Sequence, residues 1–179
     1  MVPQGCTSTT NCKVFVTFKP GSDDETSFEI GTNRRWAGFG LVPNSSATKM
    51  TGLKGHVCVL SNGNAVLSAF HASGKKKPDG YNKSVVGVWA VQGSSTNGWT
   101  SCKFKRKVNV PPESSTWMYD MGASSGHLSI IAYGKDSAMD VPVYHGFGNY
   151  FSALIDLTKV NSSTVVEDKK LNANIVAHG

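Results

Sequence analysis

The two residues best suited to chemistry in this chain are a methionine and a histidine, far apart in sequence. Met50 lies in a stretch of Ser, Thr, Lys and Gly, where its thioether is either exposed without a role or positioned for a function. His145 stands between Tyr144 and Phe147, and the glycines beside it let the backbone come close to a flat ligand. One imidazole and one thioether can together ligate a haem iron. Composition alone allows this chemistry and does not require it, because the two residues would meet only in space.

Other catalytic patterns are missing from the sequence. There is no G-x-S-x-G elbow, no H-E-x-x-H, no P-loop and no dinucleotide glycine fingerprint. The longest run of carboxylates, 23–25, falls in an expected turn. Of the other histidines, His56 and His71 alternate with apolar neighbours on expected strands, which is typical of packed or surface residues. We therefore assign no catalytic residue.

The elements that position these residues are predicted to be strands. Short apolar runs alternate with Gly, Ser, Asn and Pro turns, no window carries a long helical stripe, and Asn62-Gly63 is a strong hairpin signal. This pattern predicts an all-β, immunoglobulin-like antiparallel β-sandwich at 1–157, followed by a tail, linker or partly ordered strand at 158–179. The expected strands are Lys13–Phe18, Thr26–Ile30, Trp36–Val42, His56–Leu60, Ala65–Ala72, Val85–Val91 (the most apolar, expected in the core), Trp99–Val110, His127–Tyr133 and Phe151–Leu157.

Cysteines and sequons indicate an oxidising compartment. The chain has four cysteines (Cys6, Cys12, Cys58 and Cys102) and three Asn-x-Ser/Thr sequons in polar stretches (Asn44, Asn82 and Asn161). Four cysteines allow three pairings, of which we favour Cys6–Cys12 and Cys58–Cys102. No stretch is apolar enough for a membrane span, and 1–4 lacks the start of a signal peptide. A secreted protein or an ectodomain is expected.

The net charge of +6 comes mostly from two basic clusters, Lys75–Lys77 and Lys103–Lys107. They are either solvated loop and edge-strand lysines or a docking patch for an acidic partner. Nucleic acid is not expected as a partner, because the chain carries no recognised binding motif and has the marks of an extracellular protein.

Five stretches, taken in order, resemble the DOMON family of extracellular β-sandwich domains. They are Trp36–Leu41, Lys49–Gly52, Cys58 ahead of Asn62–Asn64, the run Ser101–Pro111, and Tyr144–Gly146. The resemblance covers roughly Cys6 to Leu157. It relates the chain to the cytochrome domain of cellobiose dehydrogenase and to animal ferric-chelate reductase-like proteins, which also have cysteines at the places of Cys58 and Cys102.

The resemblance implies haem b, iron protoporphyrin IX, held between Met50 and His145. Met139 is a rival ligand. The haem wall would be formed by four aromatic residues, Trp36, Phe39, Tyr144 and Phe147, and Lys49 or Arg106 would pair with a propionate. The loop between Trp36 and Met50 is longer than in the cellobiose dehydrogenase type.

The function implied by the resemblance is extracellular electron transfer. The redox partner would be a membrane cytochrome b or a ferric chelate, within a transmembrane ferric reductase system. Two alternatives remain: a binding module whose aromatics (Trp36, Trp99 and Tyr144) stack on a glycan or other small ligand, and an adhesive ectodomain that uses its lysine clusters.

Overall fold

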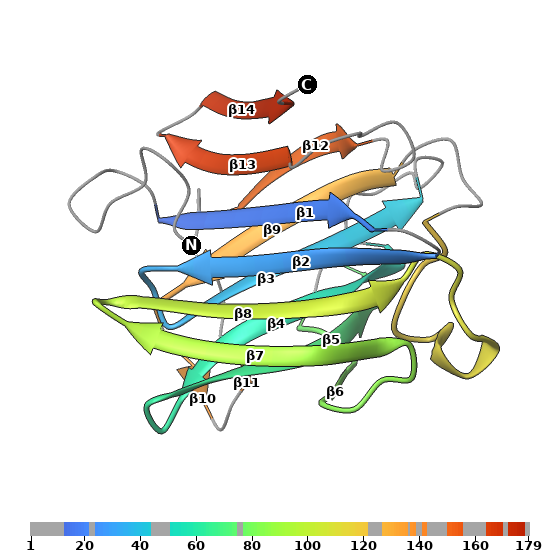
Figure 1. The fold of residues 1–179 in the computed structure, drawn as a ribbon, viewed down its shortest axis with the longest axis horizontal. Coiled ribbons are helices and arrows are strands. Elements are labelled where there is room, and N and C mark those ends of the chain that lie inside the picture. The colour runs from blue at the N-terminus through green and yellow to red at the C-terminus, as the bar shows by residue number, and fades with distance from the viewer. Residues whose placement is uncertain are drawn as a thin grey trace.

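The computed structural model is a sandwich of two antiparallel sheets (Figure 1). The residues it describes are 13–21, 24–43, 51–74, 77–121, 127–135, 137–138, 141–142, 150–155, 164–169 and 172–177. Within them the only helical turn is a 3₁₀ segment, Pro112–Ser114. The predicted all-β class is confirmed.

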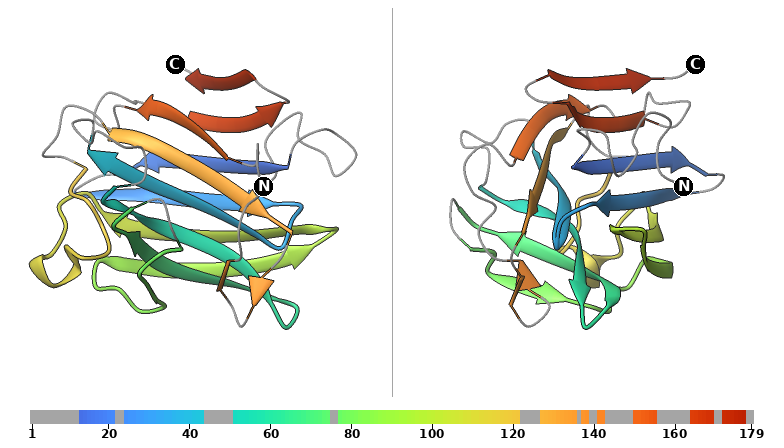
Figure 2. Two further views of the ribbon diagram at one scale, coloured as in Figure 1. Left: turned by 180° about the vertical axis from the view of Figure 1, so that it is seen from behind. Right: turned by 90° about the vertical axis from the view of Figure 1, so that its left-hand side faces the viewer.

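One sheet, which we call the β1 sheet, has six strands in the order β14-β13-β1-β2-β8-β7. Its strands are β1 Val14–Pro20, β2 Glu25–Thr32, β7 Val88–Thr96, β8 Trp99–Lys107, β13 Thr164–Lys169 and β14 Asn172–Ala177. The segment expected as a tail, linker or partly ordered strand thus contributes β13 and β14, which extend this sheet beyond β1 (Figure 2).

The second sheet, the β3 sheet, has the order β12-β9-β3-β4-β5-β6. Its strands are β3 Trp36–Pro43, β4 Leu53–Ser61, β5 Asn64–Ala72, β6 Gly80–Asn82, β9 His127–Gly134 and β12 Tyr150–Ile155. A separate two-stranded ribbon is formed by β10 Ser137–Ala138 and β11 Val141–Pro142. Because β3 lies near the centre of its sheet, the other elements of interest can be placed relative to it.

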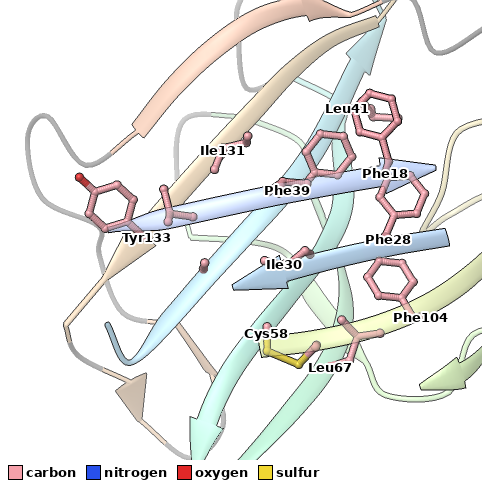
Figure 3. Packing of buried hydrophobic residues seen from close by; sticks show 14 of the residues in the cluster. Phe18, Phe28, Ile30, Phe39, Leu41, Cys58, Leu67, Phe104, Ile131 and Tyr133 are labelled. Atoms are coloured by element: carbon pink, nitrogen blue, oxygen red, sulfur yellow. A yellow bond between two sulfur atoms is a disulfide. The ribbon is translucent and has the colours of Figure 1, made fainter. Parts of the chain in front are cut away.

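The main core fills the space between the two sheets (Figure 3). Phe28 on β2 stacks on Phe104 of β8 with ring centroids 5.4 Å apart, and on its other side it contacts Phe39 of β3 at 5.7 Å. Residues at alternate positions of each strand face this core, as the two-residue period of a strand requires. The Cys58–Cys102 disulfide links β4 to β8 and so joins the two sheets, which confirms that predicted pair. Cys6 and Cys12 lie outside the described residues.

The turn between β4 and β5 is the predicted hairpin. Asn62 and Gly63 have φ values of 46° and 81°, and Ser61 pairs with Asn64. Positive φ at both central residues is the signature of a type I′ turn, which matches the twist of the flanking strands. This turn fixes the register of β4, and with it which residues of β4 face each side of the sheet.

The prediction of a core strand at Val85–Val91 is wrong. The strand here, β7, begins three residues later at Val88 and is the last strand at one end of the β1 sheet. Val86 and Val91 are 56% and 51% exposed. A bulge between Trp89 and Gln92 interrupts the pairing with β8. The run is rich in apolar residues, but its position at a sheet edge leaves most of them unburied.

Candidate functional site

The β3 sheet is apolar on both faces. Its inward-facing residues join the main core, while the alternate positions form a second buried cluster on the side turned away from the β1 sheet. We call this second surface the outer apolar face. It comprises Trp36, Val42, Leu53, Val57, Val59, Phe70, Ala72 and Ile130, each no more than 8% exposed. An antiparallel sandwich usually keeps the outer faces of its sheets polar and wet, so this face is built to be covered.

The outer face of the β1 sheet is mixed, since Phe15 and Trp99 are buried there against each other while charged pairs lie over β2 and β8. There Lys105 on β8 pairs with Glu25 on β2 at 2.8 Å, and Lys103 lies 3.7 Å from Glu29. These side chains are partly exposed, and each lysine of the basic run has a carboxylate within reach. The buried cluster on the outer face of the β3 sheet has eight members against two on that of the β1 sheet, so burial is much more extensive on the β3 sheet.

Gly38 differs from two other glycines on the outer apolar face in the room that a side chain would have. At Gly40 an added Cβ would lie 2.5 Å from the Leu53 side chain, and at Gly134 it would lie 2.4 Å from the indole nitrogen of Trp36. At Gly38 the nearest atom of the described residues would be 3.5 Å away, an ordinary contact. Side chains of the sheet therefore fill the space over two of these glycines, whereas an added Cβ at Gly38, which is itself buried, would make only ordinary contacts.

Two polar atoms near this face are buried without a hydrogen-bond partner in the described part of the chain. They are the indole nitrogen of Trp36 and the hydroxyl of Tyr81, whose ring packs 6.4 Å from that of Phe70. Burial raises the pKa of Tyr81 to about 12, so this hydroxyl stays protonated. Both groups are hydrogen-bond donors, and buried donors are normally paired. An acceptor-bearing ligand would satisfy them.

Most of the predicted haem residues lie outside the described residues. These are Met50, His145, Tyr144, Phe147, Lys49 and the rival Met139. The residues directly after Met50, Thr51 and Gly52, are described, and Gly52 has a φ of +74°. The hydroxyl of Tyr119 donates a hydrogen bond to the Gly52 carbonyl at 2.5 Å. The backbone immediately after the candidate methionine is thus fixed.

The two candidate ligand segments join the β3 sheet at opposite ends of β3. Residues 44–50 follow Pro43, which pairs with His127 at the start of β9. Residues 143–149 run into Tyr150, which pairs with Ala132 near the end of β9. Before that segment, the β10–β11 ribbon lies against β4. The same sheet therefore anchors both segments, one from each end.

Two other predicted site residues do not lie on the outer apolar face. The sequence predicts Trp36 and Phe39 in one wall, but residues three apart on a strand face opposite ways, and Phe39 is buried between the sheets. Arg106 lies on the inner side of β8, 3% exposed, and its guanidinium donates to the Tyr119 carbonyl at 2.5 Å. Phe39 is thus a core residue, and Arg106 is not available to a ligand on the outer apolar face.

The other residues noted in the sequence either pack against neighbouring side chains or lie outside the described residues. His71 lies 3.8 Å from Asp79 and contacts the edge of Trp117. Trp99, a candidate for sugar stacking, is 7% exposed and packs on Phe15. Of the three sequons, Asn82 ends β6 and is half-buried, while Asn44 and Asn161 lie outside the described residues. Among the described residues, no group of three or more His, Cys, Asp or Glu side chains could hold a metal ion.

Sequence reasoning missed the outer apolar face, although a signal was present. Residues 57–60, Val-Cys-Val-Leu, are continuously apolar, and this pattern is typical of a strand buried on both faces.

The fold and this face together define a class: a two-sheet antiparallel sandwich in which one sheet is covered on both sides. Comparison with protein families matched the DOMON domain over residues 9–124. The chain belongs to the DOMON domain family.

A search of solved structures found the cytochrome b domain of pyranose dehydrogenase from Coprinopsis cinerea, with a TM-score of 0.53 and 13% sequence identity. The match covers 87% of this chain and 82% of that one. At this identity the likeness shows a shared fold. A search of curated proteins found no match. None of the described helical segments is long and apolar enough to cross a membrane.

Proposed function

We propose that this domain binds haem b against the outer apolar face and passes single electrons. In this proposal Met50 and His145 would hold the iron. The observation that carries it is the outer apolar face itself, which is buried and in which a side chain at Gly38 would make only ordinary contacts with the described residues. A porphyrin needs an apolar slot of this kind.

The residues of this face fit the group. The apolar side chains suit the porphyrin ring, and the buried donors of Trp36 and Tyr81 could serve its carboxylates. When bound, haem supplies a one-electron couple, whose potential Met/His ligation raises. The protein residues hold the ring, exclude water and orient the ligands, and this work needs no catalytic acid or base.

Chain connectivity supports the choice of Met50. It stands three residues before Leu53, a member of the outer apolar face, so their Cα atoms are at most about 11 Å apart. His145 stands three residues after Pro142 of β11, which is held near β4. Both segments are thus joined to strands of the β3 sheet, on which the proposed site lies.

The test is an absorption spectrum of the protein loaded with haem. The reduced protein should show the sharp, split bands of low-spin haem, and either Met50→Ala or His145→Ala should abolish them. Matched controls are Met139→Ala, for the rival thioether, and His71→Ala, for a partly exposed histidine elsewhere. Low-spin bands that survive in both ligand variants would remove the assignment, and their loss in Met139→Ala alone would move it to the rival.

A second variant tests the face rather than the ligands. Gly38→Val would add a Cβ that makes ordinary contacts with the sheet, so the domain should fold normally. The added methyl groups would occupy the space over the sheet, and haem affinity should fall at least tenfold. Titration of the folded apoprotein with hemin measures this. An unchanged affinity would place the ring elsewhere.

The partner in this proposal is a membrane cytochrome b or a ferric chelate, so the domain would serve a transmembrane ferric reductase system from its extracellular side. A cross-sheet disulfide fits such an oxidising location. Stopped-flow mixing of the reduced protein with ferric chelates would test this step.

A further inference from the structure

A cavity lies between β5 of the β3 sheet and β7 of the β1 sheet, apart from the outer apolar face. It has a volume of about 360 Å³. Leu67 and Ala69 line it from β5, Val88 and Val91 from β7, and residues 82–86 complete the wall. Apolar side chains make up most of this lining, with Asn82, Lys83 and Ser84 beside them, and its position beside the main core separates it from the proposed haem face.

His56 places a polar group in the wall of this cavity. Its ring, 2% exposed, forms part of the wall and lies 4.7 Å from the ring of Phe104. Its Nε2 is buried and has no hydrogen-bond partner among the described residues. Leaving such an atom unpaired costs about 1–3 kcal/mol, so a group that pairs with it would gain that much on binding.

The charge state of His56 restricts what can pair with it. Burial, and then the nearby Arg106 cation, lower the pKa of His56 to about 3, so the ring is neutral. In a neutral imidazole, Nε2 is a donor in one tautomer and an acceptor in the other. A hydroxyl group suits both, because it can donate or accept.

We propose that this cavity binds a small, uncharged aromatic alcohol, whose hydroxyl hydrogen-bonds to Nε2 of His56. A cavity of about 150 Å³ holds one benzene ring, so the volume here admits two fused rings. Val86 and Val91 line the cavity yet are more than half exposed, and an apolar ring would cover them. The inference is independent of haem, since His56 and Leu67 face inward, away from the outer apolar face.

Binding of 2-naphthol to the full chain, followed by the ligand's fluorescence anisotropy, tests the proposal. Naphthalene, which lacks the hydroxyl, should bind about tenfold more weakly, as measured by saturation-transfer NMR. His56→Phe keeps a ring against Phe104 and should remove this difference. Tighter binding of 2-naphthoate than of 2-naphthol would overturn the choice of an uncharged ligand.

Variants of the wall locate the binding. Ala69→Leu fills the cavity and should abolish 2-naphthol binding, as should Val91→Trp, which starts from an exposed position and serves if a core variant fails to fold. Trp89→Ala removes a neighbouring exposed indole that does not line the cavity and should leave affinity unchanged. No binding by the parent chain, or binding that survives in both wall variants, refutes the proposal.

Discussion

Acid should weaken this fold through His56. In the folded protein the pKa of this group is about 3, against 6.5 for an ordinary histidine. Between those values the unfolded chain binds a proton that the folded chain does not, so lowering the pH favours unfolding. The stability tied to His56 is fully present above pH 6.5 and is lost as the pH falls toward 3.

The size of the effect follows from the two pKa values. Each unit of pKa difference corresponds to about 1.4 kcal/mol, so the complete loss is about 5 kcal/mol at pH 3. Most carboxylates titrate below pH 5, so the cleaner window is pH 7 to pH 5. Across it, the free energy of unfolding should fall by about 2 kcal/mol on account of His56 alone.

Urea unfolding at the two pH values measures this fall. The matched variant is His56→Phe, which keeps an aromatic ring beside Phe104 and removes the titrating group. All other groups are common to both proteins, so the difference between their pH dependences isolates the imidazole. If the parent and the variant lose stability equally between pH 7 and pH 5, His56 is not held neutral by burial and the reasoning fails.

Three further predictions concern contacts that support the sheets and the candidate site. Replacing Cys58 and Cys102 together by alanine opens a link between residues 44 apart and should cost about 4 kcal/mol, read from urea unfolding; a loss below 1 kcal/mol would contradict this. Tyr119→Phe removes the hydrogen bond to the Gly52 carbonyl and should cost about 1 kcal/mol while weakening haem binding, checked by unfolding and by hemin titration. Lys105→Ala breaks a partly exposed ion pair, so the free energy of unfolding, read from urea unfolding, should fall by about 0.2–1 kcal/mol, the range of surface pairs, and a larger loss would mark a structural role.

Local sequence signals predicted the strands and one turn because they depend only on neighbours. The hairpin at Asn62-Gly63 needs two residues that accept positive φ, and these two residue types do so most readily. Cys58 and Cys102 were paired correctly. By contrast, the prediction for Val85–Val91 was wrong. Hydrophobicity shows which side chains could be buried, but the position of β7 at the end of the β1 sheet determines which of them are.

The candidate site was harder to predict because it depends on which side of one sheet each residue faces. Trp36 and Phe39 are both large and aromatic, and sequence reasoning placed them in one wall. The two-residue period of β3 sends them to opposite faces, so only Trp36 can contribute to the outer apolar face. A strand period can be counted from sequence, but it does not show that the far side of a sheet will also be buried. Here Gly38 pairs with Val57 of β4 and with Ala132 of β9, and it is the burial of the surrounding face, rather than any motif, that makes its missing side chain relevant to ligand binding.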